Sequence, residues 1–258
     1  EMEVRILGAH NIEAREIRPA SLLIDECLAM DAGGLTSALT LSQQEKVKAV
    51  MLSHCHFDHT RDLPILGFNA ALWQGQIDVY AQQQTFDVLI PCLLDGRIYV
   101  NFLEYPSKDK PSLQLKTIKP YKREIIEGYS VLALPVKHSA PTVGYYVSSS
   151  QGKGVFYTGD TGPGLAGCWG HISPQLLITE VTAPNEFTDE LARGGHLSAL
   201  SLKEELVHFR QLKGYLPQVI AIHIVPLHEQ KVKDEVAQVA KELETDVSLG
   251  YEDMKISL

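Results

Sequence analysis

Side chains that can bind metal ions are concentrated in one short segment of the chain. Three of its ten histidines fall between His54 and His59, directly after the apolar run Val47–Leu52. If that run is a strand, His54 and His56 project from one side of an extended loop, where neutral imidazole nitrogens bind zinc at about 2.0–2.1 Å. Asp58 and His59 come next, in the turn into a helix, and can face a second ion. The spacing therefore allows a two-metal site.

The alternative is a polar loop in which the histidines only satisfy backbone groups. One histidine would favour this alternative, but three histidines and an aspartate between a strand and a helix favour metal binding. Cys55 lies inside the segment, yet its side chain points away from those of its two neighbours if the loop is extended. We therefore expect Cys55 to pack against other residues rather than to bind metal.

Three later candidate ligands, His138, Asp160 and His223, each follow shortly after a β-rich run. In α/β proteins the carboxyl ends of strands are where sites assemble. Taken alone, either histidine would more often be an ordinary strand-end residue, and Asp160 would more often cap a turn. The first cluster is what makes them candidates. His228 is a rival to His223, but it lies beyond Pro226 and off the strand end.

The pattern His-x-His-x-Asp-His from His54 to His59 resembles the defining motif of the metallo-β-lactamase superfamily. The family's later ligands find matches in His138, Asp160 and His223, so the resemblance covers nearly the whole chain. It implies a four-layer αββα sandwich that holds two divalent metal ions. The implied ligands are His54, His56 and His138 for the first ion, Asp58, His59 and His223 for the second, and Asp160 as a bridge between them.

A second region is similar to the phosphodiesterase branch of that superfamily. The segment Glu180–Glu186 reads Glu-Val-Thr-Ala-Pro-Asn-Glu, and Gly195–Ser198 reads Gly-His-Leu-Ser. Class II cyclic-nucleotide phosphodiesterases and tRNA 3′-processing endonucleases both carry a glutamate after a strand and a His-x-Ser/Thr element that opens a helix. The phosphodiesterases are the closer match, because Glu-Val-x-x-Pro-Asn and Gly-His-Leu-Ser both resemble them. This resemblance implies a phosphodiester substrate.

The chemistry of phosphodiester cleavage gives two of these residues a role of their own. An alkoxide leaving group needs a proton even where two metal ions polarise the phosphoryl group. An imidazolium can supply that proton near neutral pH, and a carboxylate on its other nitrogen keeps it oriented and charged. We therefore expect His196 to be the general acid and Glu180 its partner, with Asp58 completing the catalytic group. An exposed histidine before a helix cap is the alternative. Ser139 and Thr142 are candidate contacts to a phosphoryl oxygen.

The elements that position these residues change in kind along the chain. Short strands dominate the first third, and strand and turn patterns recur from Lys116 to Asp160. Helices are expected after His59, through a stripe of four apolar residues, and over Thr85–Leu94. The last third alternates strand and helix, which favours an α/β sandwich with two sheets. The stripe consists of Leu63, Leu66, Phe68 and Leu72. The expected strands include Val4–Leu7, Ser21–Met30, Lys48–Ser53, Ile77–Ala81, Tyr129–Val136, Leu176–Val181, Gln218–Ile224 and a closing strand at Val247–Gly250. The expected helices of the last third are Ser198–Leu212 and Glu229–Leu243.

Length and composition limit the class of protein. At about 150 residues per domain, 258 residues without an internal linker favour a single hydrolase domain over 1–258. A net charge of −9 repels polyanions, which disfavours nucleic acid as a partner. Four widely spaced cysteines favour reduced thiols, and no apolar stretch suits a signal peptide or a membrane span, so we expect a cytoplasmic protein. A homodimer is compatible with the sequence.

These observations favour a dinuclear metal-dependent phosphodiesterase, in which a metal-bridging hydroxide attacks a small or cyclic nucleotide-type diester. Zinc is the best single choice of ion, and manganese and iron also suit the mixed nitrogen and carboxylate donors. One alternative is a tRNA 3′-end endonuclease with the same chemistry. The interval between His138 and Asp160 lacks the basic arm of the bacterial-type enzymes, which disfavours this alternative. Steeply salt-dependent binding of tRNA would favour the endonuclease. Another alternative is a non-catalytic metal-binding regulatory module on the same fold. A stoichiometric metal assay that finds a site empty would favour this alternative.

Overall fold

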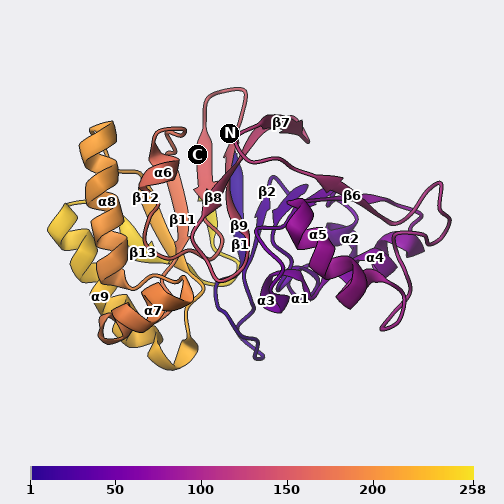
Figure 1. The fold of residues 1–258 in the computed structure, drawn as a ribbon, viewed down its shortest axis with the longest axis horizontal. Helices are drawn as coiled ribbons and strands as arrows, with labels where there is room; N and C mark the ends of the chain where they lie inside the picture. The colour runs from indigo at the N-terminus through magenta and orange to yellow at the C-terminus, as the bar shows by residue number, and fades with distance from the viewer. Residues whose placement is uncertain (1) are drawn as a thin grey trace.

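Two seven-stranded sheets pack face to face between two layers of helices in the computed structural model, which describes residues 2–258 (Figure 1). A central hydrophobic core lies between the sheets and includes Ile6 and Met51 from the first sheet and Tyr145 and Ile178 from the second. One further hydrophobic core lies between each sheet and the helices that cover it. The predicted four-layer αββα sandwich is thus confirmed.

The first sheet carries the loop with the histidine cluster. Its order is β14-β1-β2-β3-β4-β5-β6, and β3 to β6 pair in parallel. The loop that follows β4 therefore opens at the edge of the sheet where these parallel strands end. The strands are β1 (Glu3–Gly8), β2 (Ser21–Ile24), β3 (Leu28–Met30), β4 (Ala49–Met51), β5 (Ile77–Ala81), β6 (Leu113–Thr117) and β14 (Lys255–Ser257).

The second sheet has the order β13-β12-β11-β10-β9-β8-β7. Strands β7 to β10 pair antiparallel and β10 to β13 pair in parallel, so β8, β10, β11 and β12 all run in the same direction. Their carboxyl ends meet at one edge, where they present His138, Asp160, Glu180 and His223. The strands are β7 (Arg123–Ile126), β8 (Tyr129–Val136), β9 (Thr142–Ser148), β10 (Gly154–Tyr157), β11 (Leu176–Glu180), β12 (Gln218–Ile222) and β13 (Val247–Leu249).

Helices cover the outer face of each sheet (Figure 1). Helix α8 packs on the second sheet through Leu202, Leu206 and Phe209, which share one buried face. It begins where the Ser198 hydroxyl accepts a hydrogen bond from Ser201 N. The helices are α1 (Leu35–Ala38), α2 (Leu41–Gln44), α3 (Phe57–Thr60), α4 (Leu63–Leu72), α5 (Gln83–Leu89), α6 (Ala166–Trp169), α7 (Thr188–Gly194), α8 (Ala199–Lys213) and α9 (Glu229–Leu243), with short π- and 3₁₀-turns at Ile90–Leu94, Asn185–Phe187 and Pro226–His228.

Three details differ from the sequence-based expectations. The expected strand Ser21–Met30 is a hairpin, because Asp25 and Glu26 adopt positive φ and turn the chain between β2 and β3. The stripe on α4 is only partly buried, since Phe68 is 37% exposed and Leu72 64% exposed. The strand that closes the fold is β14, paired with β1, rather than β13. Within residues 2–258 no helix combines the length and apolar character needed to cross a membrane.

Candidate metal centre

The histidine segment sits in a tight loop between β4 and α3. His56 is the residue before the first turn of α3, and Asp58 lies in that turn. The loop packs directly on Gly33, where a Cβ atom would lie 1.8 Å from the carbonyl oxygen of Asp58. Glycine is therefore required at this position for the loop to approach the segment after β3 so closely.

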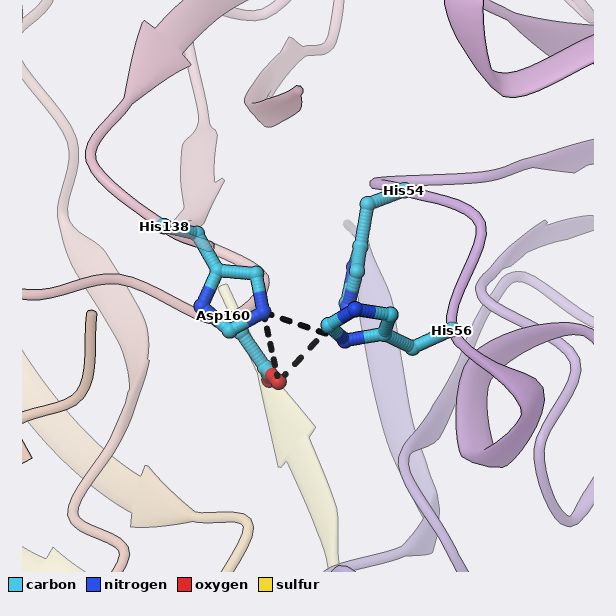
Figure 2. A group of neighbouring side chains, drawn as sticks. All are labelled: His54, His56, His138 and Asp160. Carbon is cyan, nitrogen blue, oxygen red and sulfur yellow. Dashed lines mark hydrogen bonds and ion pairs between the residues drawn. The ribbon is translucent and has the colours of Figure 1, made fainter. Parts of the chain in front are cut away.

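Four side chains from both sheets converge on the first candidate ion site: His54, His56, His138 and Asp160 (Figure 2). One ligand atom from each lies within 4.8 Å of those of the other three. Nε2 of His138 lies 3.1 Å from Nδ1 of His56, and the Nε2 atoms of His54 and His138 lie 3.7 and 3.8 Å from Oδ2 of Asp160. Three nitrogens and one carboxylate oxygen thus surround one point.

A second group contains Asp58, His59, His223 and, again, Asp160. Oδ1 of Asp160 lies 3.2 Å from Nε2 of His59 and 3.3 Å from Nε2 of His223. Oδ2 of Asp58 lies 3.3 Å from Nε2 of His223 and 3.5 Å from Nε2 of His59. Because each oxygen of Asp160 faces a different group, this carboxylate lies between the two candidate sites. The structure therefore brings together all seven residues predicted as ligands.

The donor atoms suit divalent ions because several of them are buried without a partner. Nε2 of His54, Nε2 of His59 and Oδ1 of Asp160 are buried and form no hydrogen bond with any residue from 2 to 258. Unpaired buried polar atoms are costly and uncommon in folded proteins. Mixed imidazole and carboxylate donors are also the typical ligands of zinc and of neighbouring transition metals. The residues present therefore fit a pair of divalent metal ions.

The electrostatics of the first ligand group favour the metal-binding forms of its four residues. Burial lowers the pKa of His54 well below its usual range, and it also lowers the pKa of His56 and His138, so these imidazoles are neutral and keep a lone pair. Burial opposes ionisation of Asp160, but the charges of His223 and His59 outweigh it and hold its pKa well below the usual value. Neutral nitrogens and an ionised carboxylate are what a cation requires.

Asp31 is an orienting residue that the sequence analysis did not identify. It is fully buried, and its Oδ2 accepts hydrogen bonds from Ser53 Oγ at 2.7 Å, His59 Nδ1 at 2.7 Å and Tyr157 Oη at 2.6 Å. Burial lowers the pKa of His59, but Asp160 and Asp31 raise it well above the usual value. Two carboxylates on opposite nitrogens of one imidazole thus favour positive charge at this point.

Glu180 and His196 form a pair at the rim of the metal cluster. His196 Nδ1 donates to Oε1 of Glu180 at 2.8 Å, and Glu180 is only 1% exposed. Burial lowers the pKa of His196, but the hydrogen bond and the charge of Glu180 outweigh it and raise the pKa to about 9. The His196 ring lies 4.9 Å from that of His138 and stacks 5.5 Å from that of His223. A protonated imidazole therefore lies beside both candidate ion sites.

A glycine lets the loop of His196 approach the cluster. Gly195 has φ of +80°, and a Cβ at this position would lie 2.6 Å from Cα of His138. Its carbonyl oxygen accepts the Nδ1 hydrogen of His138 at 2.9 Å. The same loop therefore carries His196 and fixes the orientation of His138, a candidate metal ligand.

The remaining predicted site residues have different positions. The exposed Ser139 has its hydroxyl 3.4 Å from Nε2 of His138, so it lies at the mouth of the cluster. Thr142 is buried and donates its hydroxyl hydrogen to the carbonyl oxygen of Ala140, so no contact brings it to the site. Cys55 packs against the core under the first sheet. The ring of His228, the rival to His223, packs beside Phe187.

Comparisons with known proteins agree with this geometry. A family model described as "Beta-lactamase superfamily domain" matches residues 22–224. The fold is similar to that of yeast PDE1, with a TM-score of 0.83, 16% identity and coverage of 100% of this chain and 99% of that one. It is also similar to the metallo-beta-lactamase fold protein YhfI from Bacillus subtilis (TM-score 0.77, 17% identity, 99% and 98% coverage) and to the short form of human tRNase Z (TM-score 0.70, 18% identity, 99% and 98% coverage). No protein of curated function matches the chain.

Proposed function

The chain belongs to the beta-lactamase superfamily, and from that premise we propose that this hydrolase is a metal-dependent phosphodiesterase acting on small or cyclic nucleotide-type diesters. The observation that carries the proposal is the pairing of Glu180 with His196 beside the two ligand groups. Hydrolysis of a β-lactam or a thioester would not account for this pair. Yeast PDE1 and human tRNase Z, both similar in fold, carry names that point to phosphodiester cleavage.

In this proposal each of the two ligand groups of the cluster would hold one ion, and Asp160 belongs to both groups. When bound, two divalent ions polarise a phosphoryl oxygen and activate a water molecule for attack on phosphorus. The imidazoles of His54, His56 and His138 are already neutral, and the carboxylates of Asp58 and Asp160 are already ionised, so these residues need no change of protonation to bind an ion. Zinc is the ion that these donors suit best, and manganese or iron can take its place.

His196 supplies the proton for the leaving group. It is protonated at neutral pH, because the Glu180 carboxylate raises its pKa to about 9. Its Nδ1 is occupied by that carboxylate, so Nε2 is the atom that can donate to a departing alkoxide. The adjacent rings of His138 and His223 place this donor at the edge of the metal cluster, where the scissile bond would lie. The hydroxyl of Ser139 can donate to a substrate oxygen at the same edge.

The proposed substrate is small because the chain offers little attraction to a nucleic acid. The net charge is −9, and a polyanion is repelled at long range unless a local basic surface overcomes that field. We also propose that residues 1–258 act as one hydrolase domain, since both sheets contribute ligands to the same cluster.

We expect the protein reconstituted with zinc to hydrolyse bis(p-nitrophenyl) phosphate and at least one of a panel of 2′,3′- and 3′,5′-cyclic nucleotides. Turnover should disappear on removal of the metal with a chelator and return when zinc is added. Two ions per chain should be found by elemental analysis. Hydrolysis of a chromogenic cephalosporin or a thioester at higher kcat/KM than every diester would contradict the proposal.

The same assay separates the two alternatives. Endonucleolytic cleavage of a precursor tRNA at its 3′ side, with binding that weakens steeply as salt rises, would favour RNA as the substrate over small diesters. A chain that binds zinc without hydrolysing any diester would indicate a non-catalytic module.

A further inference from the structure

One buried hydroxyl lies between the Glu180 carboxylate and a predicted metal ligand. Thr182 Oγ1 is 2.6 Å from Oε2 of Glu180 and 2.9 Å from Nδ1 of His223. Thr182 is 7% exposed, so water does not readily replace these contacts. Glu180 thus touches His196 directly and reaches His223 through one threonine.

Counting donors fixes the direction of these hydrogen bonds. Both oxygens of Glu180 already accept from backbone N–H groups, Oε1 from Thr161 at 2.8 Å and Oε2 from Leu197 at 3.1 Å. An ionised carboxylate only accepts, so the single hydroxyl hydrogen of Thr182 goes to Glu180. Oγ1 of Thr182 must then accept a hydrogen bond from His223, so the His223 ring carries a hydrogen on Nδ1. A hydrogen on Nδ1 leaves Nε2 as the nitrogen that can offer a lone pair to a metal ion, and Nε2 faces Asp58 and Asp160 at 3.3 Å.

The backbone alone does not give His223 this orientation. His223 follows the last residue of β12 and has φ of +64°, in the left-handed region that non-glycine residues adopt at a cost. Its N–H donates to the carbonyl oxygen of Ala9 at 2.6 Å, which anchors the backbone but does not contact the ring nitrogens. Thr182 supplies the contact that holds Nδ1.

We propose that Thr182 is a positioning residue that fixes the tautomer and orientation of His223 for the second ion. The Glu180 carboxylate then orients two histidines, His196 by a direct hydrogen bond and His223 through Thr182. The proposal rests on the metal-dependent function proposed above. Hydrogen bonds of this kind to a metal-ligating histidine typically change metal affinity by 10- to 100-fold when removed.

The first sheet repeats the arrangement with different residues, which provides an internal comparison. Ser53 Oγ donates to Oδ2 of Asp31 at 2.7 Å and lies 2.9 Å from Nδ1 of His54. By the same count of donors, His54 carries its hydrogen on Nδ1 and presents Nε2 to the first ion site. Removing the Ser53 hydroxyl should therefore weaken the first ion, whereas removing the Thr182 hydroxyl should weaken the second.

The side chain of Thr182 can be changed while its backbone stays anchored. Its N–H donates to the carbonyl oxygen of Leu197, and its own carbonyl oxygen accepts from Val225 N–H. Thr182→Val keeps the shape and removes the hydroxyl, and Thr182→Ser keeps the hydroxyl. The pair therefore separates packing from hydrogen bonding.

Zinc titration of the full-length chain against a competing chelator tests the proposal. We expect two ions in the wild type, with one of the two sites losing 10- to 100-fold in affinity in Thr182→Val and less than about 3-fold in Thr182→Ser. Ser53→Ala should instead weaken the site that Thr182→Val leaves unchanged. The proposal would be overturned by equal zinc affinities in the wild type and Thr182→Val, or by equal losses of affinity in Thr182→Val and Thr182→Ser. Fewer than two ions bound to the wild type would also overturn it.

Nitrogen-15 NMR of the zinc-loaded wild type gives a second measurement, which remains decisive even if the valine variant does not fold. It should show the His223 hydrogen on Nδ1, and a hydrogen on Nε2 would overturn the proposal. Failure of the proposed function gives a different result, namely two ions bound with the expected affinities and no hydrolysis of any diester.

Discussion

Asp160→Asn is expected to abolish diester hydrolysis and to prevent the chain from holding two ions. Among residues 2–258, Asp160 is the one carboxylate that belongs to both ligand groups, with Oδ1 near His59 and His223 and Oδ2 near His54 and His138. An asparagine has the same shape, but it lacks the charge and offers only one oxygen. We expect kcat/KM to fall by about 10³-fold or more, which corresponds to about 4 kcal/mol of transition-state stabilisation.

The zinc content of this variant should fall below two ions per chain, as measured by elemental analysis after dialysis. Asp109→Asn, an exposed aspartate in a loop, is the matched control and should keep wild-type activity and zinc content. Circular dichroism should show the same secondary structure in all three proteins. An Asp160→Asn protein that keeps both ions and turns over a diester within 10-fold of wild type would refute the assignment of Asp160 as the shared ligand.

The convergence of the seven candidate ligands could be predicted because these residues have a linear signature. Four of the seven lie in one six-residue segment, and the other three follow shortly after β-rich runs whose ends meet in an α/β sandwich. The Glu180 and His196 pair was also predictable, since a glutamate at the end of a strand and a histidine before a helix are compatible with one catalytic role. The structure places the two side chains 2.8 Å apart.

The residues that hydrogen-bond to the candidate ligands have no such signature. Asp31 stands in the segment Asp-Ala-Gly-Gly, which is typical of a turn, and nothing in the sequence places it 2.7 Å from His59, 28 positions later. Ser53 and Thr182 are common in loops, and their roles depend on which neighbour takes the hydroxyl hydrogen. Such contacts are set by tertiary packing, so local patterns do not reveal them.

Packing also explains the errors in the secondary structure. Periodicity treated Ser21–Met30 as one strand because the residues on both sides of the turn are apolar, while the turn itself depends on positive φ at Asp25 and Glu26. Strand β14 was missed because its three residues are stabilised by pairing with β1, more than 240 positions earlier in the chain. Short strands are defined by their partners more than by their own composition.

Replacing His196 is expected to slow cleavage only where the leaving group needs a proton. An alkoxide, such as the ribose oxygen of a nucleotide, leaves poorly without one, and general acid catalysis contributes typically 10²- to 10⁴-fold. The p-nitrophenolate ion leaves without protonation. His196→Asn should therefore reduce kcat for a cyclic nucleotide by about 10²-fold or more and for bis(p-nitrophenyl) phosphate by less than about 10-fold. His208→Asn, an exposed histidine on α8, is the matched control.

Glu180→Gln should combine this defect with that of Thr182→Val, because Glu180 contacts both His196 and Thr182. Glutamine has no charge to hold the imidazolium, so the pKa of His196 falls. His196 must be protonated to act as the acid, so activity falls as pH rises through its pKa. This fall should occur at a lower pH in Glu180→Gln than in the wild type, when both proteins are measured with saturating zinc. The same variant should also bind less tightly the zinc ion whose affinity falls in Thr182→Val. If Glu180→Gln shifted the pH profile and left zinc affinity unchanged, the carboxylate would act on His196 alone, and the link through Thr182 to His223 would be wrong.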